Sequence, residues 1–229
     1  MEKKLDLKDI VLIGRTFNEY YKMFNIISIN KNEKILDVAS GVSSFCAEST
    51  ALGYTASDRI YCFSAEDIEK KCAKDLETTM EKMAEVKDIF KWEFFKNIED
   101  LEVQRKKAYK AFIADFKQTE GVRYVTTAYP KNDFKDKQFT ISLISHFLFM
   151  YDDHLDYKFH KQTIKEIIRI TSKEIRIFPI VNLKGERSKF VDELMKDKEF
   201  ADNEIIIIKV DYEFVKGGNE MLVIKAHSK

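Results

Sequence analysis

The stretch that decides the fold is K-I-L-D-V-A-S-G-V-S-S-F, residues 34–45. Its first half is a short apolar run, and Gly41 follows directly. Residues 44–52 then carry apolar side chains at helical spacing, so the order is strand, turn and helix. After a glycine that can end this helix, residues 54–58 form a second short strand, which closes on Asp58.

The rest of the chain extends this alternation. Residues 66–116 hold neither glycine nor proline and carry apolar side chains every three or four positions, which predicts two or three helices. Beyond Gly121 the pattern predicts strands at 122–126, 139–144, 174–180, 205–210 and 221–225, with helices at 155–170 and 188–195. The K-G-G-N sequence at residues 216–219 joins the last two strands as a hairpin.

These elements define the fold class. Strands that alternate with helices predict an α/β domain with a seven-stranded, doubly wound, Rossmann-like and mostly parallel sheet, in which the C-terminal hairpin adds an antiparallel strand. Since no repeat or Ser-, Gly- or Pro-rich linker occurs, residues 1–229 are expected to form a single domain, with a helical cap inserted at about 64–118. The four isoleucines 205–208 predict a strand buried on both faces.

Composition narrows the function classes. The 39 Lys and Arg residues balance 39 Asp and Glu residues, so the chain lacks the basic excess typical of nucleic-acid binding. Three cysteines without a CxxC pair indicate reduced thiols and a cytoplasmic protein. The longest apolar stretch, residues 139–151, is interrupted by polar side chains and is shorter than the roughly 20 residues that a bilayer requires, so no membrane association is predicted.

The first turn is the expected ligand site. Ligands of an open parallel sheet bind beyond the carboxyl ends of its strands, where the turn at 37–45 lies. Gly41 allows the backbone to approach a ligand, and the following helix directs free N–H groups towards an anion. Only one glycine of the dinucleotide motif G-x-G-x-x-G is present, which disfavours an NAD(P)-binding oxidoreductase without excluding it. Asp58, 21 residues after Asp37, can accept two hydrogen bonds from ribose hydroxyls and indicates an adenosine ligand.

An acidic residue in the first strand, a single-glycine turn and a ribose-binding acid together resemble the class I S-adenosylmethionine-dependent methyltransferases, over nearly the whole chain. G-R-T-F-N-E-Y-Y-K-M-F at 14–24, S-H-F-L-F-M-Y-D-D at 145–153 and Y-E-F-V-K-G-G-N-E-M-L at 212–222 look like a little-characterised microbial group of that superfamily. The resemblance implies S-adenosylmethionine as cofactor and supplies no acceptor.

The resemblance also assigns residues to parts of the cofactor. These are Ala39 and Gly41 for the methionyl part, Asp58 for the ribose, Ala128 and Tyr129 for the adenine edge, and Ser145 for the methionyl amine. Ser43 stands where the superfamily often has a glycine. This departure leaves open a protein that binds S-adenosylmethionine or S-adenosylhomocysteine without transferring the methyl group.

Four further residues are candidates by their chemistry. Arg15 lies on the segment that covers the cofactor in such proteins, and its guanidinium could pair with the methionyl carboxylate; the alternative is a solvated arginine. Tyr20 follows on the same segment, where ordinary helix packing is the alternative. Asp37 is a carboxylate in a buried strand, which is costly unless it orders the turn or binds the ligand's amine. His146 follows the fourth strand, where it could accept a proton from the acceptor, or could be hydrogen-bonded in a packed wall.

The sequence predicts no metal and a small-molecule acceptor. Asp152, Asp153 and Asp156 lie close to two histidines, but they precede a predicted helix, where capping and the helix dipole favour them. The cap region mixes acidic residues among its lysines and aromatic side chains, which suits a small acceptor better than RNA. Because a sulfonium methyl group is already reactive, positioning of the acceptor is the main requirement. The oligomeric state is left open.

Overall fold

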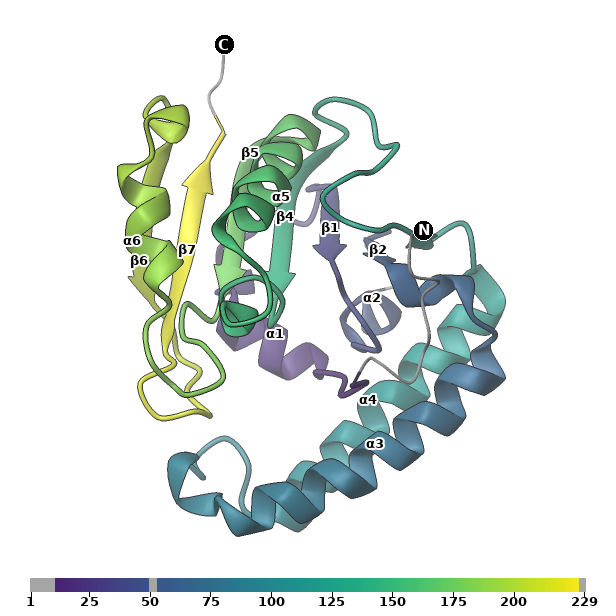
Figure 1. Ribbon diagram of the computed structural model, residues 1–229. Coiled ribbons are helices and arrows are strands. Elements are labelled where there is room, and N and C mark those ends of the chain that lie inside the picture. The colour runs from purple at the N-terminus through teal and green to yellow at the C-terminus, as the bar shows by residue number, and fades with distance from the viewer. Residues whose placement is uncertain (1–10, 50–52, 227–229) are drawn as a thin grey trace, which may run out of the picture.

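The structure, a computed structural model, describes residues 11–49 and 53–226. Its seven strands form one sheet in the order β3-β2-β1-β4-β5-β7-β6 (Figure 1). They are β1 Ile35–Val38, β2 Thr55–Asp58, β3 Tyr124–Thr126, β4 Phe139–Ser145, β5 Thr171–Phe178, β6 Glu204–Lys209 and β7 Glu220–Lys225. Strands β1–β5 are mutually parallel, and β7 is antiparallel to both β5 and β6. The predicted α/β sheet with its antiparallel hairpin strand is confirmed.

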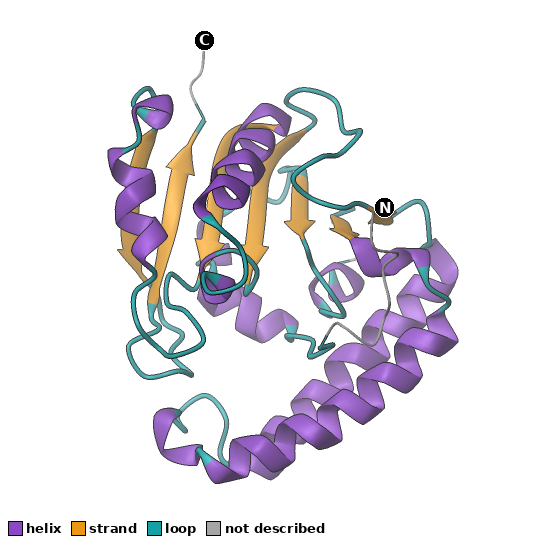
Figure 2. Cartoon of the chain, in the orientation of Figure 1, coloured by secondary structure: helices purple, strands orange, loops and turns teal. Residues whose placement is uncertain are grey.

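Helices cover both faces of the sheet (Figure 2). They are α1 Phe17–Met23, α2 Phe45–Glu48, α3 Ala65–Glu85, α4 Ile98–Thr119, α5 Tyr157–Ile170 and α6 Lys189–Lys196, with the short 3-10 helices η2 Ile26–Ser28, η4 Arg59–Cys62, η5 Lys87–Ile89, η6 Phe149–Tyr151 and η7 Lys198–Phe200. One hydrophobic core lies between the sheet and α1–α4, and the other between the sheet, α5 and α6. No helix in the described part of the chain is both long and apolar enough to span a membrane.

The cap consists of α3 and α4, which follow β2 and precede β3. Side chains of Ser64 and Asn97 accept hydrogen bonds from backbone N–H groups in the first turns of α3 and α4, which fixes where both helices begin. In α3, Ile68, Cys72, Leu76 and Met80 recur every four residues and form the buried stripe that packs on α4. The helix pair passes below the carboxyl ends of the parallel strands in the view of Figure 1.

The far end of the cap is fastened to the loop between β6 and β7. Lys91 donates its backbone N–H to the carbonyl oxygen of Phe214 at 2.7 Å, and Lys216 donates to that of Ile89 at 3.1 Å. The rings of Phe90 and Phe214 stack with their centroids 4.8 Å apart. We call these contacts the clasp. The cap therefore bridges from the β2 side of the sheet to its opposite, hairpin side.

Two local predictions need correction. The helix predicted at 44–52 is only four residues long: α2 ends at Glu48, Ser49 follows in a turn, and residues 50–52 lie outside the described residues. The strand at Ile205–Ile208 is not buried on both faces: β6 is the edge of the sheet and its isoleucines are half-buried. They alternate between the two cores, but among the described residues only β7 lies beside β6, so these side chains are only partly covered.

Candidate functional site

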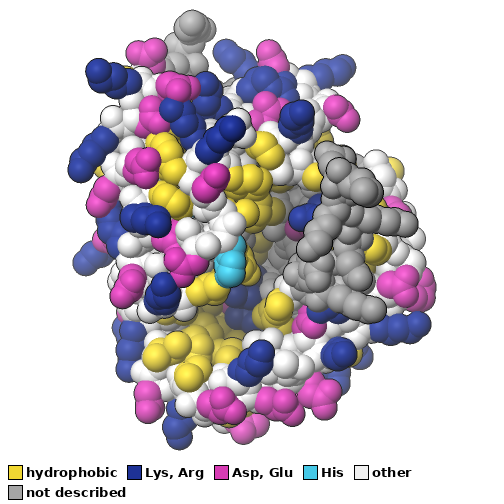
Figure 3. Space-filling model, in the orientation of Figure 1, with side chains coloured by type: hydrophobic (Ala, Val, Ile, Leu, Met, Phe, Trp, Pro, Cys, Tyr) yellow, Lys and Arg dark blue, Asp and Glu magenta, His cyan; other side chains and the backbone are white. Residues whose placement is uncertain are grey.

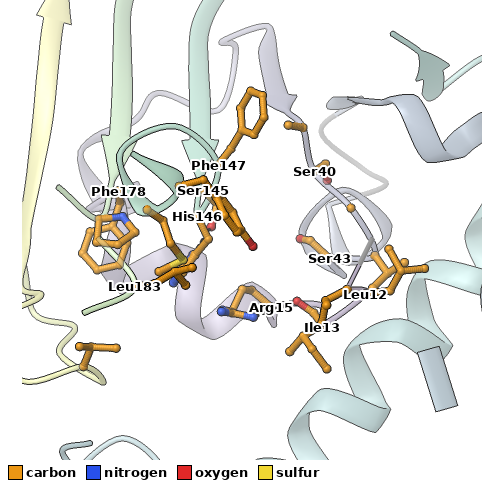
Figure 4. A pocket seen from close by; sticks show the side chains of 18 of the residues that line it. Leu12, Ile13, Arg15, Ser40, Ser43, Ser145, His146, Phe147, Phe178 and Leu183 are labelled. Atoms are coloured by element: carbon orange, nitrogen blue, oxygen red, sulfur yellow. Dashed lines mark hydrogen bonds between the residues drawn. The ribbon is translucent and has the colours of Figure 1, made fainter. Parts of the chain in front are cut away.

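A cavity of about 860 Å³ lies at the carboxyl edge of the sheet, between the strand ends and the cap. This volume is near the upper end of the roughly 300–1,000 Å³ typical of small-ligand sites. Figure 3 shows a hollow on this face with hydrophobic side chains along its wall. In Figure 4, Ser40 and Ser43 after β1 lie opposite Ser145 and His146 at the end of β4, and Arg15 lies below the space between them.

Nine of the ten residues singled out in the sequence line this cavity: Arg15, Tyr20, Ala39, Gly41, Asp58, Ala128, Tyr129, Ser145 and His146. They come from α1 and the segment before it, from the turn after β1, from the end of β2, from the loop after β3 and from the end of β4. The tenth, Asp37, lies beneath the cavity. The fold thus brings them together at one place, while their roles towards a ligand stay predictions.

Asp37 holds the turn after β1 in place. Its side chain is fully buried, and its carboxylate accepts hydrogen bonds from the hydroxyls of Ser40 at 2.6 Å and Tyr20 at 3.1 Å. Burial raises the pKa of Asp37 to about 7, although the two hydroxyl donors oppose the rise. Ala39 and Gly41 both have positive φ, +50° and +57°, so the turn is tightly wound around this carboxylate.

Asp58 joins the turn after β1 to the end of β2. Its Oδ2 accepts the backbone N–H of Gly41 at 2.8 Å and its Oδ1 accepts that of Ile60 at 3.0 Å. Burial raises the pKa of Asp58, and these N–H donors counteract the rise. Each carboxylate oxygen can accept a further hydrogen bond, so Asp58 keeps acceptor capacity for a ligand in the cavity.

The residues present fit S-adenosylmethionine. A Cβ added to Gly41 would meet no described atom within 4 Å, so a ligand has open space beside this backbone. Asp58 supplies acceptors for ribose hydroxyls, and Arg15, whose side chain is 20% exposed, supplies donors for a carboxylate. Ile60 and Phe147 also line the cavity, and the ring centroid of Phe147 lies 6.3 Å from that of Tyr129, which supplies apolar surface for an adenine ring.

His146 is held in an unusual conformation at the end of β4. Its φ is +51°, in the left-handed region, and its backbone N–H donates to the carbonyl oxygen of Phe178 at 2.7 Å. Its Nδ1 is hydrogen-bonded to the hydroxyl of Ser145 at 2.8 Å, and its Nε2 has no partner among the described residues. Burial, together with the charges of Arg15 and Arg105, lowers its pKa well below 6.5, so the imidazole is neutral at physiological pH.

Sequence reasoning missed a buried polar cluster under the cavity. Arg105 of α4 forms a two-pronged ion pair with Glu19 of α1, and Tyr212, after β6, donates its hydroxyl to the same carboxylate at 2.7 Å. Burial opposes ionisation of Glu19, but the charge and hydrogen bonds of Arg105 outweigh it and lower the pKa of Glu19. Glu19 and Tyr212 lie in the segments 14–24 and 212–222 quoted above, whereas nothing in its own sequence context distinguishes Arg105.

The acidic residues near the start of α5 act locally. Asp156 accepts the backbone N–H of Phe159 at 2.8 Å and caps the helix, while Asp153 forms an exposed ion pair with Lys184 at 2.7 Å. Within residues 11–49 and 53–226, no group of three or more His, Cys, Asp or Glu side chains is arranged to hold a metal ion.

No family model matches this chain. Several solved structures are similar at low identity. A tRNA (m1A58) methyltransferase TrmI from Aquifex aeolicus is 8% identical over 93% of this chain and 69% of its own, with a TM-score of 0.44. A putative S-adenosyl-L-methionine-dependent methyltransferase from Methanococcus maripaludis is 13% identical over 93% and 88%, with a TM-score of 0.46. At TM-scores below 0.5, these likenesses assign neither an activity nor a substrate to this chain.

A protein of Methanocaldococcus jannaschii, named uncharacterized protein MJ0045, is 52% identical to this chain over 225 residues, which cover 96% of this chain and 98% of the relative. The strand order with an antiparallel β7 independently gives the Rossmann-like fold of the class I methyltransferases. The chain therefore has the class I methyltransferase fold and belongs to the same protein family as MJ0045.

Proposed function

We propose that this protein is an S-adenosylmethionine-dependent methyltransferase that acts on a small-molecule acceptor. The observation that carries the proposal is the meeting of Asp58, the turn at 39–43 and Arg15 around one cavity at the switch point of the sheet. One molecule that combines an adenosine with an amino acid can contact all three. Its ribose hydroxyls reach the Asp58 carboxylate, its carboxylate reaches Arg15, and the open glycine turn lies between them.

Each part of the cofactor has a proposed partner. Asp58 accepts hydrogen bonds from the ribose, Arg15 pairs with the methionyl carboxylate, and Ser145 approaches the methionyl amine. Ala128 and Tyr129 border the adenine. Tyr129 is itself positioned by a hydrogen bond between its hydroxyl and that of Ser57 at 2.7 Å.

Ser43, the departure from the superfamily pattern, does not argue against binding. It is 2% exposed, and its hydroxyl accepts the backbone N–H of Phe45 at 3.1 Å, at the start of α2. Its side chain therefore satisfies a free backbone N–H at the first residue of α2. Gly41, where backbone approach matters, is retained, so the turn keeps the conformation that a cofactor needs.

Catalysis by these residues is mainly a matter of position. The bound cofactor supplies a methyl group on a sulfonium, which is reactive without further activation. The cap and the clasp border the cavity, and the apolar walls hold an acceptor at a reactive distance. His146 is neutral, and its Nε2 has no hydrogen-bond partner in the described part of the chain, so it can take up the proton that the methyl acceptor loses.

Calorimetric titration with S-adenosylmethionine and S-adenosylhomocysteine tests the proposal. We expect micromolar binding by the wild type, and a loss of about 1.5–3 kcal/mol of binding free energy in Asp58→Asn, because bonds to the ribose are weakened. Asp202→Asn, an exposed site in the turn before β6, should bind like the wild type. Thermal melting of each variant separates lost binding from lost folding.

Three results would point elsewhere. Folded wild type that binds neither ligand contradicts the proposed cofactor. Binding of NAD(P) in place of S-adenosylmethionine would favour the oxidoreductase alternative. Tight binding without turnover across a broad panel of acceptors would favour a protein that binds the cofactor and transfers nothing.

A further inference from the structure

The cavity is also lined by residues other than those proposed for the cofactor. On the side of the cap and of the loops after β5 and β6, which we call the second compartment, the walls are mainly apolar, with Thr79 and Asn182 among them. Its apolar side chains come from the cap, from the loop after β5 and from the loop after β6: Met80, Met83, Ile89, Phe90, Pro179, Val181, Leu183, Phe214 and Val215. Here the backbone groups of the cap tip and the hairpin loop are partly paired with each other in the clasp. A nucleic acid or peptide would leave its own polar groups unpaired against such walls, which is costly.

Few charged side chains lie beside this compartment. Arg15 and Arg105 both lie close to the buried carboxylate of Glu19, and the other charged residues that line the cavity, Asp58 and Arg59, lie at the end of β2. Arg105 is only 3% exposed and is occupied by Glu19 and by the carbonyl oxygen of Gly14, so it offers little to a ligand. If the methionyl carboxylate pairs with Arg15, as proposed above, neither arginine beside the compartment is left for an anionic acceptor. In the complex with S-adenosylhomocysteine, which carries no sulfonium, an anion would then be buried against apolar side chains without a close cation, and this is costly. A neutral acceptor has no such cost.

Aromatic rings and thioethers lie among the aliphatic side chains of the lining. Phe90 stacks on Phe214, and the ring of Phe178 meets that of His146 edge-on with centroids 5.7 Å apart. Met80 and Met83 of α3 face the same space. Ring edges and flexible, polarisable methionine side chains pack well against flat aromatic molecules.

His146 completes the compartment with one proton acceptor. It lines the cavity at the end of β4, its Nδ1 is engaged by Ser145, and its Nε2 has no partner among the described residues (Figure 4). We propose that the acceptor is a neutral aromatic hydroxyl compound, methylated on its oxygen, with His146 as the base; this inference rests on the proposed function.

The transfer balances without any further reactant. The hydroxyl proton moves to Nε2 of His146, the oxygen forms a bond to the methyl carbon, and the bond from that carbon to sulfur breaks with its electron pair left on sulfur. The imidazolium then returns its proton to solvent. The step requires a neutral imidazole with its proton on Nδ1, donated to the hydroxyl of Ser145, so that the lone pair of Nε2 can accept the proton.

Binding of probe compounds tests the acceptor class on the full-length protein saturated with S-adenosylhomocysteine. Calorimetry with 2-naphthol and 2-naphthoate compares a neutral hydroxyl with an anion on the same ring system. We expect 2-naphthol to bind at least tenfold more tightly than 2-naphthoate. Met83→Glu, which puts a charge into the apolar wall, should weaken 2-naphthol binding at least tenfold and change S-adenosylhomocysteine binding less than twofold.

Thr78→Glu is the matched control, because it adds the same charge to an exposed position of α3. It should change neither affinity. Three outcomes overturn the inference while the proposed function stands: no binding of 2-naphthol, equal or tighter binding of 2-naphthoate, or unchanged 2-naphthol binding in Met83→Glu. Failure of the wild type to bind S-adenosylhomocysteine overturns the proposed function itself, at a step that precedes any probe.

Discussion

Arg105 and Glu19 form a bidentate ion pair in the interior, with Nη2 of Arg105 2.8 Å from Oε1 of Glu19, and they join the cap to α1. Their side chains are 3% and 0% exposed, and Tyr212 attaches the segment after β6 to the same carboxylate. Three parts of the chain that surround the cavity are therefore fixed to one another beneath it.

We expect Arg105→Met to lower the free energy of unfolding by about 3–5 kcal/mol, because it leaves the Glu19 carboxylate buried without a cation. Urea denaturation measures the change. The double variant with Glu19→Gln should lose less than Arg105→Met alone, since no buried charge remains. Lys173→Met, which removes an exposed ion pair with Glu33, should cost under about 1 kcal/mol. A similarly small cost for Arg105→Met would show that the pair does not fasten the cap.

Asp37 predicts a pH dependence of stability. Its folded pKa, about 7, lies above its usual value of 3.8, so the folded state retains a proton that the unfolded state releases. Its contribution to stability is therefore fully present below pH 3.8 and is lost as the pH rises towards 7, with a slope of at most about 1.4 kcal/mol per pH unit. Asp37→Asn, which cannot ionise, should remove this slope. Denaturation curves of both proteins between pH 4 and 8 check it, and identical slopes would contradict the raised pKa.

His146 predicts the opposite dependence at slightly acidic pH. Its folded pKa lies below 6.5, so the unfolded state takes up a proton first, and stability falls as the pH drops below 6.5. NMR titration should find the His146 ring still neutral at pH 6.5. His146→Asn suits the measurement, because asparagine tolerates a positive φ and the variant identifies the resonance. A His146 signal with its midpoint at 6.5 or above would refute its assignment as a base that is neutral at physiological pH.

Gly14 allows the segment before α1 to approach the turn after β1. A Cβ at this position would lie 2.2 Å from the carbonyl oxygen of Val42, which is too short for a non-bonded contact between carbon and oxygen. Gly14→Ala must therefore displace the segment that carries Arg15. We expect a loss of about 1–3 kcal/mol of stability and weaker S-adenosylmethionine binding. In Gly121→Ala the new Cβ meets no described atom within 4 Å, so strain at its φ of +75° is the only cost and binding should not change. Equal binding by both variants would contradict a role for this close approach.

The sequence predicted the sheet and most of the site because both depend on local signals. The run 34–39, the glycine turn and the strand that closes on Asp58 show their periodicity and turn chemistry within a few residues. Because the strands of a parallel sheet run in the same direction, their carboxyl ends all lie at one edge. Residues that follow these ends, such as Gly41, Ser145 and His146, therefore come together without any specific pairing between them. The prediction that β6 is buried on both faces was wrong, because a run of apolar residues does not reveal whether a strand lies at the centre or at the edge of a sheet.

What the sequence determined by itself is the class of fold and the edge of the sheet where the candidate site lies. Only the tertiary structure decided what encloses that site. Glu19 pairs with Arg105, 86 residues further along the chain, and with Tyr212, 193 residues further along. The clasp joins Phe90 to Val215 in the loop after β6, which is also distant in sequence. No local periodicity encodes such contacts, because they form only when the folded sheet and cap bring charged and aromatic side chains together away from water.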